Sequence, residues 1–277
     1  MSGPPSGPGA AASLRVDGIE VGTVGSRWLE RALEPPTPFA LQDGALVLSA
    51  PGTPFAARTA ALADWAQRIR QRWDLPGWRD EPIVVREAPR TGARPLFAIE
   101  RALLRPLGLP LRSVQACAWT PTPAGPLLWV ARRSPAKPVD PGRLDALVGG
   151  GIGGFDEPLP TLLRECAEEA GIPEALARRA RPAGTLETDY AAVDAGLTVR
   201  HREFVTLYDL WLPAGFVPVA ADGEHAAILT MTPAQASASI AAGEWTREGG
   251  RATVDLIRRR GWATRPGRGP ADDAASG

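Results

Sequence analysis

One stretch of this chain constrains its fold and chemistry more than any other: the run LVGGGIGGFDEPLPTLLRECAEEAGI, residues 147–172. On a helix, Glu165, Glu168 and Glu169 fall at i, i+3 and i+4, so the three carboxylates share one face. Like charges on one stripe repel each other, and a cation would neutralise them. Carboxylate oxygens are hard ligands that suit Mg²⁺ or Mn²⁺. The spacing therefore predicts a divalent-metal site on a helix over residues 158–170.

The residues around these glutamates support that interpretation. The triple glycine at residues 149–151 allows unusual backbone angles and the close approach of a ligand, and a main-chain carbonyl there can complete a coordination shell. The alternative is an ordinary surface helix with a solvated acidic face, which is common. The opposite face is apolar and is predicted to anchor the helix on a sheet; it comprises Leu159, Leu162, Leu163 and Cys166.

The composition argues against several classes of function. Lys plus Arg and Asp plus Glu both number 31, so the chain lacks the basic excess that binding to a nucleic acid polymer needs. No run reaches the roughly 18 apolar residues that a membrane span requires. Two cysteines, Cys117 and Cys166, argue against a disulfide framework or a Cys/His zinc site. The sequence predicts a cytoplasmic protein that binds neither nucleic acid polymers nor membranes.

Composition and hydrophobic patterning divide the chain into four parts. Ends rich in Gly, Pro and Ala predict disordered tails at residues 1–12 and 265–277. Residues 13–110 are predicted to form an N-terminal α+β domain. Residues 111–264 are predicted to form a second domain, in which strands mix with helices without regular βαβ spacing. The predicted fold class is therefore α+β.

Local patterns predict the individual elements. Apolar residues three to four positions apart predict a long helix over residues 54–73. Asp43-Gly44 predicts a tight turn between two strands within residues 39–48. Residues 83–86 are predicted to form a strand, and residues 97–105 a second helix. In the second domain we expect strands over residues 114–120, 127–131, 184–187, 197–212 and 228–231, and helices over residues 158–170, 233–242 and 252–260.

The first-named run resembles the Nudix box, which reads Gly, five residues, Glu, seven residues, Arg-Glu-apolar, one residue, Glu-Glu, one residue, Gly-apolar. The matching residues are Gly150, Arg164-Glu165-Cys166, Glu168-Glu169 and Gly171-Ile172. One departure exists, because Asp156, followed by Glu157, stands where the family has Glu. In the family this acid typically pairs with the box arginine. The resemblance therefore implies that Arg164 holds Asp156 or Glu157 and fixes the loop against the helix.

Other segments resemble the Nudix branch related to thiamine pyrophosphokinase sequences. They are Gly77 to Val85, Trp129 to Ile152, Arg164 to Gly184 and Val205 to Pro218. That branch carries an N-terminal domain of uncharacterised role before the Nudix domain. The resemblance implies a C-terminal Nudix α/β/α sandwich with a mixed sheet, preceded by a smaller α+β domain. The N-terminal domain's role is left open among gating the pocket, contacting substrate and forming a homodimer.

The resemblance also implies roles for particular residues. Glu165, Glu168 and Glu169 would bind the metal, with the Gly149 carbonyl as a fourth ligand. Glu224 resembles the downstream acid that many Nudix enzymes add as a ligand or base; a plain loop glutamate is the alternative. Metal ions would neutralise the diphosphate and lower the pKa of a bound water, and Glu169 or Glu224 would orient or deprotonate this water.

The predicted function is metal-dependent hydrolysis of a diphosphate linkage in a nucleoside- or thiamine-type small molecule, with Glu169, Glu224 and Arg164 in catalytic roles. The alternative is a non-catalytic Nudix-fold binding or regulatory module. Such proteins usually lose box acids, whereas three remain here. Thiamine pyrophosphokinase activity itself is disfavoured, because the resemblance lies in the Nudix half and no Walker-type loop is seen.

Two further groups of residues have a functional and a structural interpretation. Arg132, Arg133 and Lys137 form a basic loop before the box that could meet a diphosphate, but charged loops are usually just solvated. Trp129 and Trp211 lie in strand-like runs and could line a pocket for a flat ring. Core packing is the favoured prediction for both.

Overall fold

The computed structural model describes residues 11–262, apart from residues 50, 51, 74, 76, 138, 195 and 222. The fold is α+β, as the sequence predicts. The chain forms two compact units that alternate along the sequence. Unit 1 comprises Met1–Val114, Gly150–Thr161 and Thr185–Thr206, and unit 2 comprises Gln115–Gly149, Leu162–Gly184 and Leu207–Gly277. The predicted tails lie outside the described residues except for Ala11 and Ala12, and Ala12 is the first residue of a strand.

Unit 1 begins with a four-stranded sheet of order β2-β1-β4-β3. Its strands are β1 (Ala12–Val16), β2 (Ile19–Val24), β3 (Phe39–Gln42) and β4 (Ala45–Leu48), and helix α1 (Ser26–Ala32) follows β2. The antiparallel strands β3 and β4 meet at the predicted turn, where Asp43 (φ 48°) and Gly44 (φ 75°) both have positive φ angles. Two such residues are what a tight hairpin turn of this length requires, so this dipeptide fixes the register.

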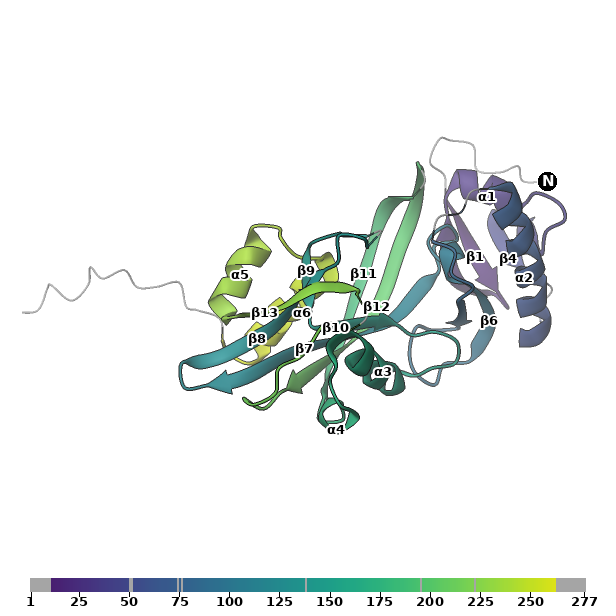
Figure 1. The fold of residues 1–277 in the computed structure, drawn as a ribbon. Coiled ribbons are helices and arrows are strands. Elements are labelled where there is room, and N and C mark those ends of the chain that lie inside the picture. Colours follow the sequence, from purple (N-terminus) through teal and green to yellow (C-terminus); the bar gives the residue numbers. More distant parts are fainter. Residues whose placement is uncertain are drawn as a thin grey trace, which may run out of the picture. The chain divides into compact units, whose positions relative to one another are not determined.

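Helix α2 (Phe55–Arg72) is the long helix predicted for the N-terminal part of the chain, and Figure 1 shows it beside the strands of unit 1. Its apolar stripe, which includes Leu62 and Trp65, is buried. Trp65 meets Phe39 of β3 edge to face, with ring centroids 5.1 Å apart. Each large apolar side chain buried in this way contributes roughly 1.5–3 kcal/mol relative to exposure, so the stripe holds α2 against the core of unit 1.

The second predicted helix, over residues 97–105, is wrong. The chain there forms β6 (Pro95–Glu100), paired antiparallel with β5 (Pro82–Arg86), and then a single 3-10 turn, η1 (Arg101–Leu103). All residues of β6 after Pro95 are buried, so both faces of the strand are covered. A short, continuous apolar run has no period that separates a buried strand from a buried helix, and here the pairing with β5 decides.

The larger sheet has the order β11-β12-β7-β8-β13, with β10 paired to β7 and β9 paired to β8. Its strands are β7 (Pro110–Thr122), β8 (Gly125–Arg133), β9 (Leu144–Ala146), β10 (Val148–Gly151), β11 (Arg181–Asp194), β12 (Leu197–Trp211) and β13 (His225–Met231). Each predicted strand of the second domain is present, and most extend beyond the predicted residues. The strands β7, β10, β11 and β12 each contribute residues to both units.

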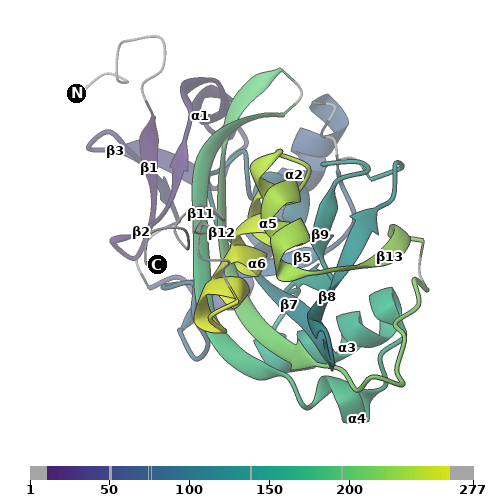
Figure 2. The ribbon, with the colours of Figure 1, turned by 90° about the vertical axis from the view of Figure 1, so that its left-hand side faces the viewer.

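Helices α3 (Pro158–Ala170) and α4 (Glu174–Ala177) lie between β10 and β11 along the chain. Helices α5 (Pro233–Ala241) and α6 (Arg247–Arg259) follow β13. In unit 2, α5 and α6 lie against one face of the strands β8, β9 and β13 (Figure 2). Helix α6 begins earlier than predicted and includes Gly249, where an added Cβ would collide with the Asp145 carboxylate, so close packing explains this glycine. None of the described helices combines the length and the apolar character that crossing a bilayer requires.

Candidate metal centre

Helix α3 carries the acidic stripe, and its ends are those predicted. It begins at Pro158, which suits a first helical turn because that turn needs no N–H from it. It ends at Gly171, whose φ is 59°. The N–H of Gly171 donates to the Ala167 carbonyl (3.2 Å), and the N–H of Ile172 donates to the Cys166 carbonyl (2.9 Å). This glycine-terminated end fixes the length of the segment that presents the glutamates.

The apolar side of α3 is buried, with one exception. Leu162 and Cys166 are fully buried and anchor the helix, as predicted. Leu163 is half-buried. Leu159, which the sequence assigned to the same face, is instead 39% exposed, because it lies in the first turn before the buried part of the helix begins.

Glu169 is the most deeply buried of the three predicted carboxylate ligands, with 3% of its surface exposed. Its Oε2 accepts a hydrogen bond from the N–H of Gly149 (2.8 Å). Burial raises the pKa of Glu169 well above the usual carboxyl value; the bond from Gly149 opposes this rise, and the charges of Glu165 and Glu224 add to it. A buried carboxyl group in this state takes up a proton or a cation.

Glu165 shares this environment. Burial raises the pKa of Glu165; the charge of Arg164 opposes the rise, and the charges of Glu168 and Glu224 add to it. Glu224, which lies immediately before β13, therefore acts electrostatically on both Glu165 and Glu169. The charge of Glu224 is thus felt by both helix glutamates.

Glu168 and Arg164 lie on the exposed side of the helix. The Glu168 side chain is 54% exposed, and Arg164 Nη1 lies 3.1 Å from its Oε2. Arg164 Nη2 lies 2.9 Å from Glu165 Oε1. The implied pairing of Arg164 with Asp156 or Glu157 is therefore corrected, because α3 places Arg164 within reach of these two glutamates instead. Arg164 screens charge on the helix, whereas the loop is held by other residues.

Residues 150–157, which precede α3, are called the box loop. The acid that holds this loop is Glu157, whereas the neighbouring Asp156 is exposed. Arg112 Nη2 lies 3.0 Å from Glu157 Oε2, and Arg86 Nη2 lies 3.4 Å from Glu157 Oε1. Burial acts to raise the pKa of Glu157, but a hydrogen bond with Thr91 and the bond and charge of Arg112 outweigh it, so the pKa is lowered. No sequence pattern predicts these partners, because they stand far from the box along the chain.

The predicted basic loop is wrong for two of its three residues, because Arg132 and Arg133 belong to strand β8 and only Lys137 lies in the loop that follows; all three make internal contacts. Lys137 forms an ion pair with Glu224, and the N–H of Ser134 donates to the Glu224 carbonyl (2.8 Å). Arg132 donates to the Gly142 carbonyl (3.0 Å). Arg133 Nη1 lies 3.3 Å from Asp145 Oδ2. The loop therefore positions Glu224 at the site.

Asp145 is a buried acid near this site that sequence reasoning missed. Burial raises its pKa to about 6, while Arg133 and a hydrogen bond with Thr246 act in the opposite direction. Its charge in turn raises the pKa of Glu169. The available signal was a single charged residue inside the apolar run Leu144 to Val148, which is unusual for a buried strand.

The two tryptophans considered for a pocket differ in burial. Trp129 is half-buried, and its Nε1–H donates to the Thr120 hydroxyl (2.9 Å). Trp211 is 38% exposed, so the prediction of core packing is wrong for this residue. It stands at the end of β12 with the Arg179 guanidinium 5.7 Å from its ring centroid.

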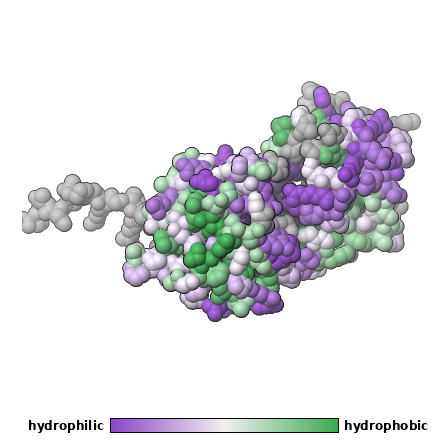
Figure 3. All heavy atoms as spheres, viewed as in Figure 1, coloured by the Kyte–Doolittle hydropathy of each residue, from purple (hydrophilic) through white to green (hydrophobic). Residues whose placement is uncertain are grey.

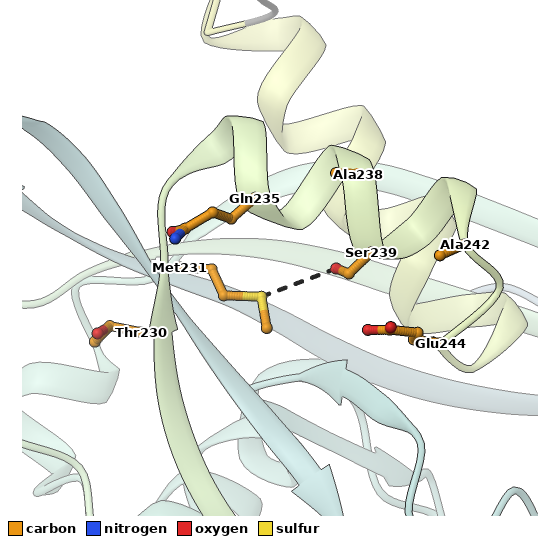
Figure 4. A pocket seen from close by; sticks show the side chains of 7 residues that line it. All are labelled: Thr230, Met231, Gln235, Ala238, Ser239, Ala242 and Glu244. Carbon is orange, nitrogen blue, oxygen red and sulfur yellow. Dashed lines mark hydrogen bonds between the residues drawn. The ribbon is translucent and has the colours of Figure 1, made fainter.

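An open depression of about 530 Å³ lies elsewhere in unit 2, between β13 and α5 (Figure 4). Its lining residues are Thr230, Met231, Gln235, Ala238, Ser239, Ala242 and Glu244. Figure 3 shows an apolar area on the face of the molecule that carries β8 and β13 in the view of Figure 1. None of the predicted metal ligands lines this depression, so the candidate site is defined by the acids of α3.

The donor set of α3 fits a hard divalent cation. Three carboxylates and a nearby glycine backbone supply oxygen ligands of the kind that Mg²⁺ and Mn²⁺ prefer. Burial and mutual repulsion raise the pKa values of Glu165 and Glu169, and cation binding relieves both effects. Among the residues that the structure describes, the carboxylate oxygens of Glu165, Glu168 and Glu169 do not all lie within 4.8 Å of one another. The Glu168 carboxylate is instead paired with Arg164 on the exposed side of the helix.

Two known protein families match this chain. The NUDIX domain matches residues 111–253, more than half of the chain. The Domain of unknown function (DUF4743) matches residues 8–110. The chain therefore belongs to the Nudix domain family.

The chain is similar to two curated plant proteins and to one solved structure. Nudix hydrolase 24, chloroplastic, from Arabidopsis thaliana is 35% identical over 167 residues, which are 60% of this chain and 44% of the relative. Nudix hydrolase 20, chloroplastic, from the same plant is 33% identical over 183 residues, which are 66% of this chain and 47% of the relative. The chain thus spans about half the length of these curated relatives. A solved structure, DR0079 from Deinococcus radiodurans, is 26% identical with a TM-score of 0.46, covering 65% of this chain and 98% of that one.

Proposed function

We propose that the chain is a Nudix pyrophosphohydrolase that uses Mg²⁺ or Mn²⁺ to hydrolyse a diphosphate linkage in a small molecule. The observation that carries the proposal is Glu169, a buried carboxyl group whose pKa is raised beside Glu165 and Glu224. The acids of a plain surface helix are solvated and keep ordinary pKa values. Gathering them in a buried place costs free energy unless a cation neutralises them.

In this proposal the metal would be held by the carboxylates of Glu165, Glu168 and Glu169 and by the Gly149 carbonyl. When bound, it would neutralise the negative charge of the diphosphate. Glu169 or Glu224 accepts a proton from the attacking water. The water oxygen bonds to one phosphorus as the bridging P–O bond breaks, and the electron pair of that bond leaves with the second phosphate. Such a transfer needs mainly positioning and charge stabilisation, which this small set of side chains can provide.

Two residues next to the acids orient them for this reaction. The N–H of Gly149 directs one oxygen of Glu169, and the ammonium group of Lys137 holds the carboxylate of Glu224.

For the substrate we propose a thiamine-type diphosphate derivative, with nucleoside diphosphate derivatives as the second class. The support is the resemblance of Gly77 to Val85 and Val205 to Pro218 to the thiamine pyrophosphokinase-related branch. The names of the Arabidopsis relatives specify Nudix hydrolases without a substrate. A non-catalytic Nudix-fold module is the competing proposal, and the retained acids of α3 oppose it.

A release assay tests the proposal. The purified chain is incubated with thiamine diphosphate and its analogues, nucleoside diphosphate derivatives and dinucleotides, each with Mg²⁺, with Mn²⁺ and with a chelator. We expect release of a monophosphate product from at least one class, and loss of that release in chelator. A chain that binds a compound from the panel in the presence of metal, yet releases no product, would instead be the non-catalytic module.

A further inference from the structure

The box loop is held by side chains from the N-terminal part of the chain, and all of these residues belong to unit 1. We name Glu157 with Arg86, Thr91 and Arg112 the Glu157 clamp. Arg112 lies at 3.0 Å and Arg86 at 3.4 Å from the two different carboxylate oxygens of Glu157. The arginine side chains are themselves buried, with 10% and 8% exposed. A carboxylate bound at both oxygens by buried arginines has one defined orientation.

The backbone of the loop is bound to the same strands. The N–H of Ile152 donates to the Arg112 carbonyl (2.8 Å), so Arg112 binds the loop through its main chain and its side chain. The N–H of Gly154 donates to the Pro82 carbonyl (3.0 Å) at the start of β5. These bonds fix the loop at three points between Gly150 and the start of α3.

Glu157 also begins the helix. Its carbonyl accepts the N–H of Thr161 (3.2 Å) and the Thr161 hydroxyl (3.1 Å), which closes the first turn of α3. One residue therefore joins the side-chain clamp to the helix that carries the glutamates. The other end of the loop is Gly149, whose N–H binds Glu169.

We propose that Arg86 and Arg112 are positioning residues for the metal site: through Glu157 they set the loop that presents the Gly149 backbone and the start of the helix that presents the glutamates. This proposal rests on the proposed function. It also assigns a role to the domain of unknown function, which supplies Arg86 and Thr91 from within its matched range. The clamp takes the place of the pairing that Arg164 does not make.

The test compares two neutralised carboxylates of unit 1. Glu157→Gln removes the charge that Arg86 and Arg112 bind. Asp17→Asn is the matched control, because Asp17 also binds two arginines, Arg58 and Arg94, neither of which binds Glu157. Affinity for Mn²⁺ alone is measured by calorimetry, and amide hydrogen exchange is followed across residues 150–157. Hydrolysis of the best substrate of the wild-type chain gives kcat and KM.

We expect Glu157→Gln to weaken Mn²⁺ binding by about 10-fold or more, because residues that orient metal ligands have effects of this size. Exchange across the loop is expected to accelerate, and kcat to fall by a similar factor while KM changes less. Asp17→Asn is expected to change Mn²⁺ affinity and kcat by less than about twofold, even if it lowers the unfolding temperature. Unchanged Mn²⁺ affinity and loop exchange in Glu157→Gln would overturn the proposal, as would equal losses in both variants.

A second pair of variants covers the case in which Glu157→Gln does not fold. Arg112→Lys keeps the positive charge and Arg112→Met removes it. The positioning role requires Arg112→Lys to retain more Mn²⁺ affinity than Arg112→Met, and equal affinities contradict it. If the wild-type chain hydrolyses nothing in the panel, the proposed function fails, yet the Mn²⁺ affinities and exchange rates still decide whether the clamp orders the site.

Discussion

The two halves of the box hold their acids in opposite electrostatic states. In the loop half, Arg86 and Arg112 neutralise Glu157, and its pKa is lowered. In the helix half, Glu169 is buried and Glu165 is half-buried, and burial together with their like charges raises the pKa values of both. Within one motif, the loop acid therefore has a structural role and the helix acids have a chemical role. Glu157 is neutralised by arginines and holds the loop. Glu165 and Glu169 repel each other and, among the described residues, neither pairs with two arginines, so they are suited to bind a cation.

The largest effect is expected from the helix half. Glu169→Gln removes the buried carboxylate, and kcat is expected to fall by about 10²-fold or more, because a ligand or proton acceptor is lost. The matched control is Glu174→Gln, whose exposed side chain forms an i,i+4 pair with Arg178 on α4. Steady-state kinetics of both variants provides the measurement. If Glu169→Gln keeps wild-type kcat, the assignment of the helix half to chemistry is incorrect.

The pH dependence of stability provides the sharpest test of the contrast. A lowered pKa means that ionised Glu157 stabilises the fold; this contribution is present above the ordinary value of 4.5 and is lost as pH falls through the folded-state pKa. A raised pKa means that ionised Glu169 destabilises the fold; its favourable contribution is present below 4.5 and is lost as pH rises through the folded-state pKa.

Opposite shifts in the unfolding temperature therefore follow in metal-free protein at pH 7. Glu157→Gln is expected to lower the midpoint, and Glu169→Gln to raise it. The rise in Glu169→Gln is expected to disappear as pH falls towards 4.5, whereas the loss in Glu157→Gln shrinks only below that value. Thermal unfolding in chelator across this pH range measures both. Shifts of the same sign at pH 7 would remove the distinction between the two halves.

The smallest effect is expected at the position where the family motif has its first glutamate. Asp156 occupies that position but is exposed, and the half-buried Glu157 makes the ion pairs with Arg86 and Arg112. Asp156→Asn is expected to change kcat and the unfolding temperature very little, since exposed substitutions are usually within about 0.5 kcal/mol. A loss as large as that of Glu157→Gln would show that the motif's register, rather than the observed contacts, identifies the acid that holds the loop.

Short sequence patterns predicted the turns and helix ends whose conformation depends on neighbouring residues alone. The turn at Asp43-Gly44 and the bounds of α3 followed from residues that favour one backbone conformation, including Gly171 at the helix end. The segment at residues 97–105 could not be predicted in this way, because its strand depends on pairing with β5. For the same reason Arg86 and Arg112 were missed as partners of Glu157, since only the folded chain brings them together.

The line between the two compact units runs through the box, with Gly150–Thr161 in unit 1 and Gln115–Gly149 and Leu162–Gly184 in unit 2. The two family matches, in contrast, meet between residues 110 and 111. The boundary between the two family matches therefore differs from the boundaries between the compact units. A fragment that starts at residue 111 keeps the complete motif but lacks Arg86, Thr91 and β5. If Arg86 and Arg112 position the metal site as we propose, exchanging the N-terminal region for another would leave the motif without the Glu157 clamp.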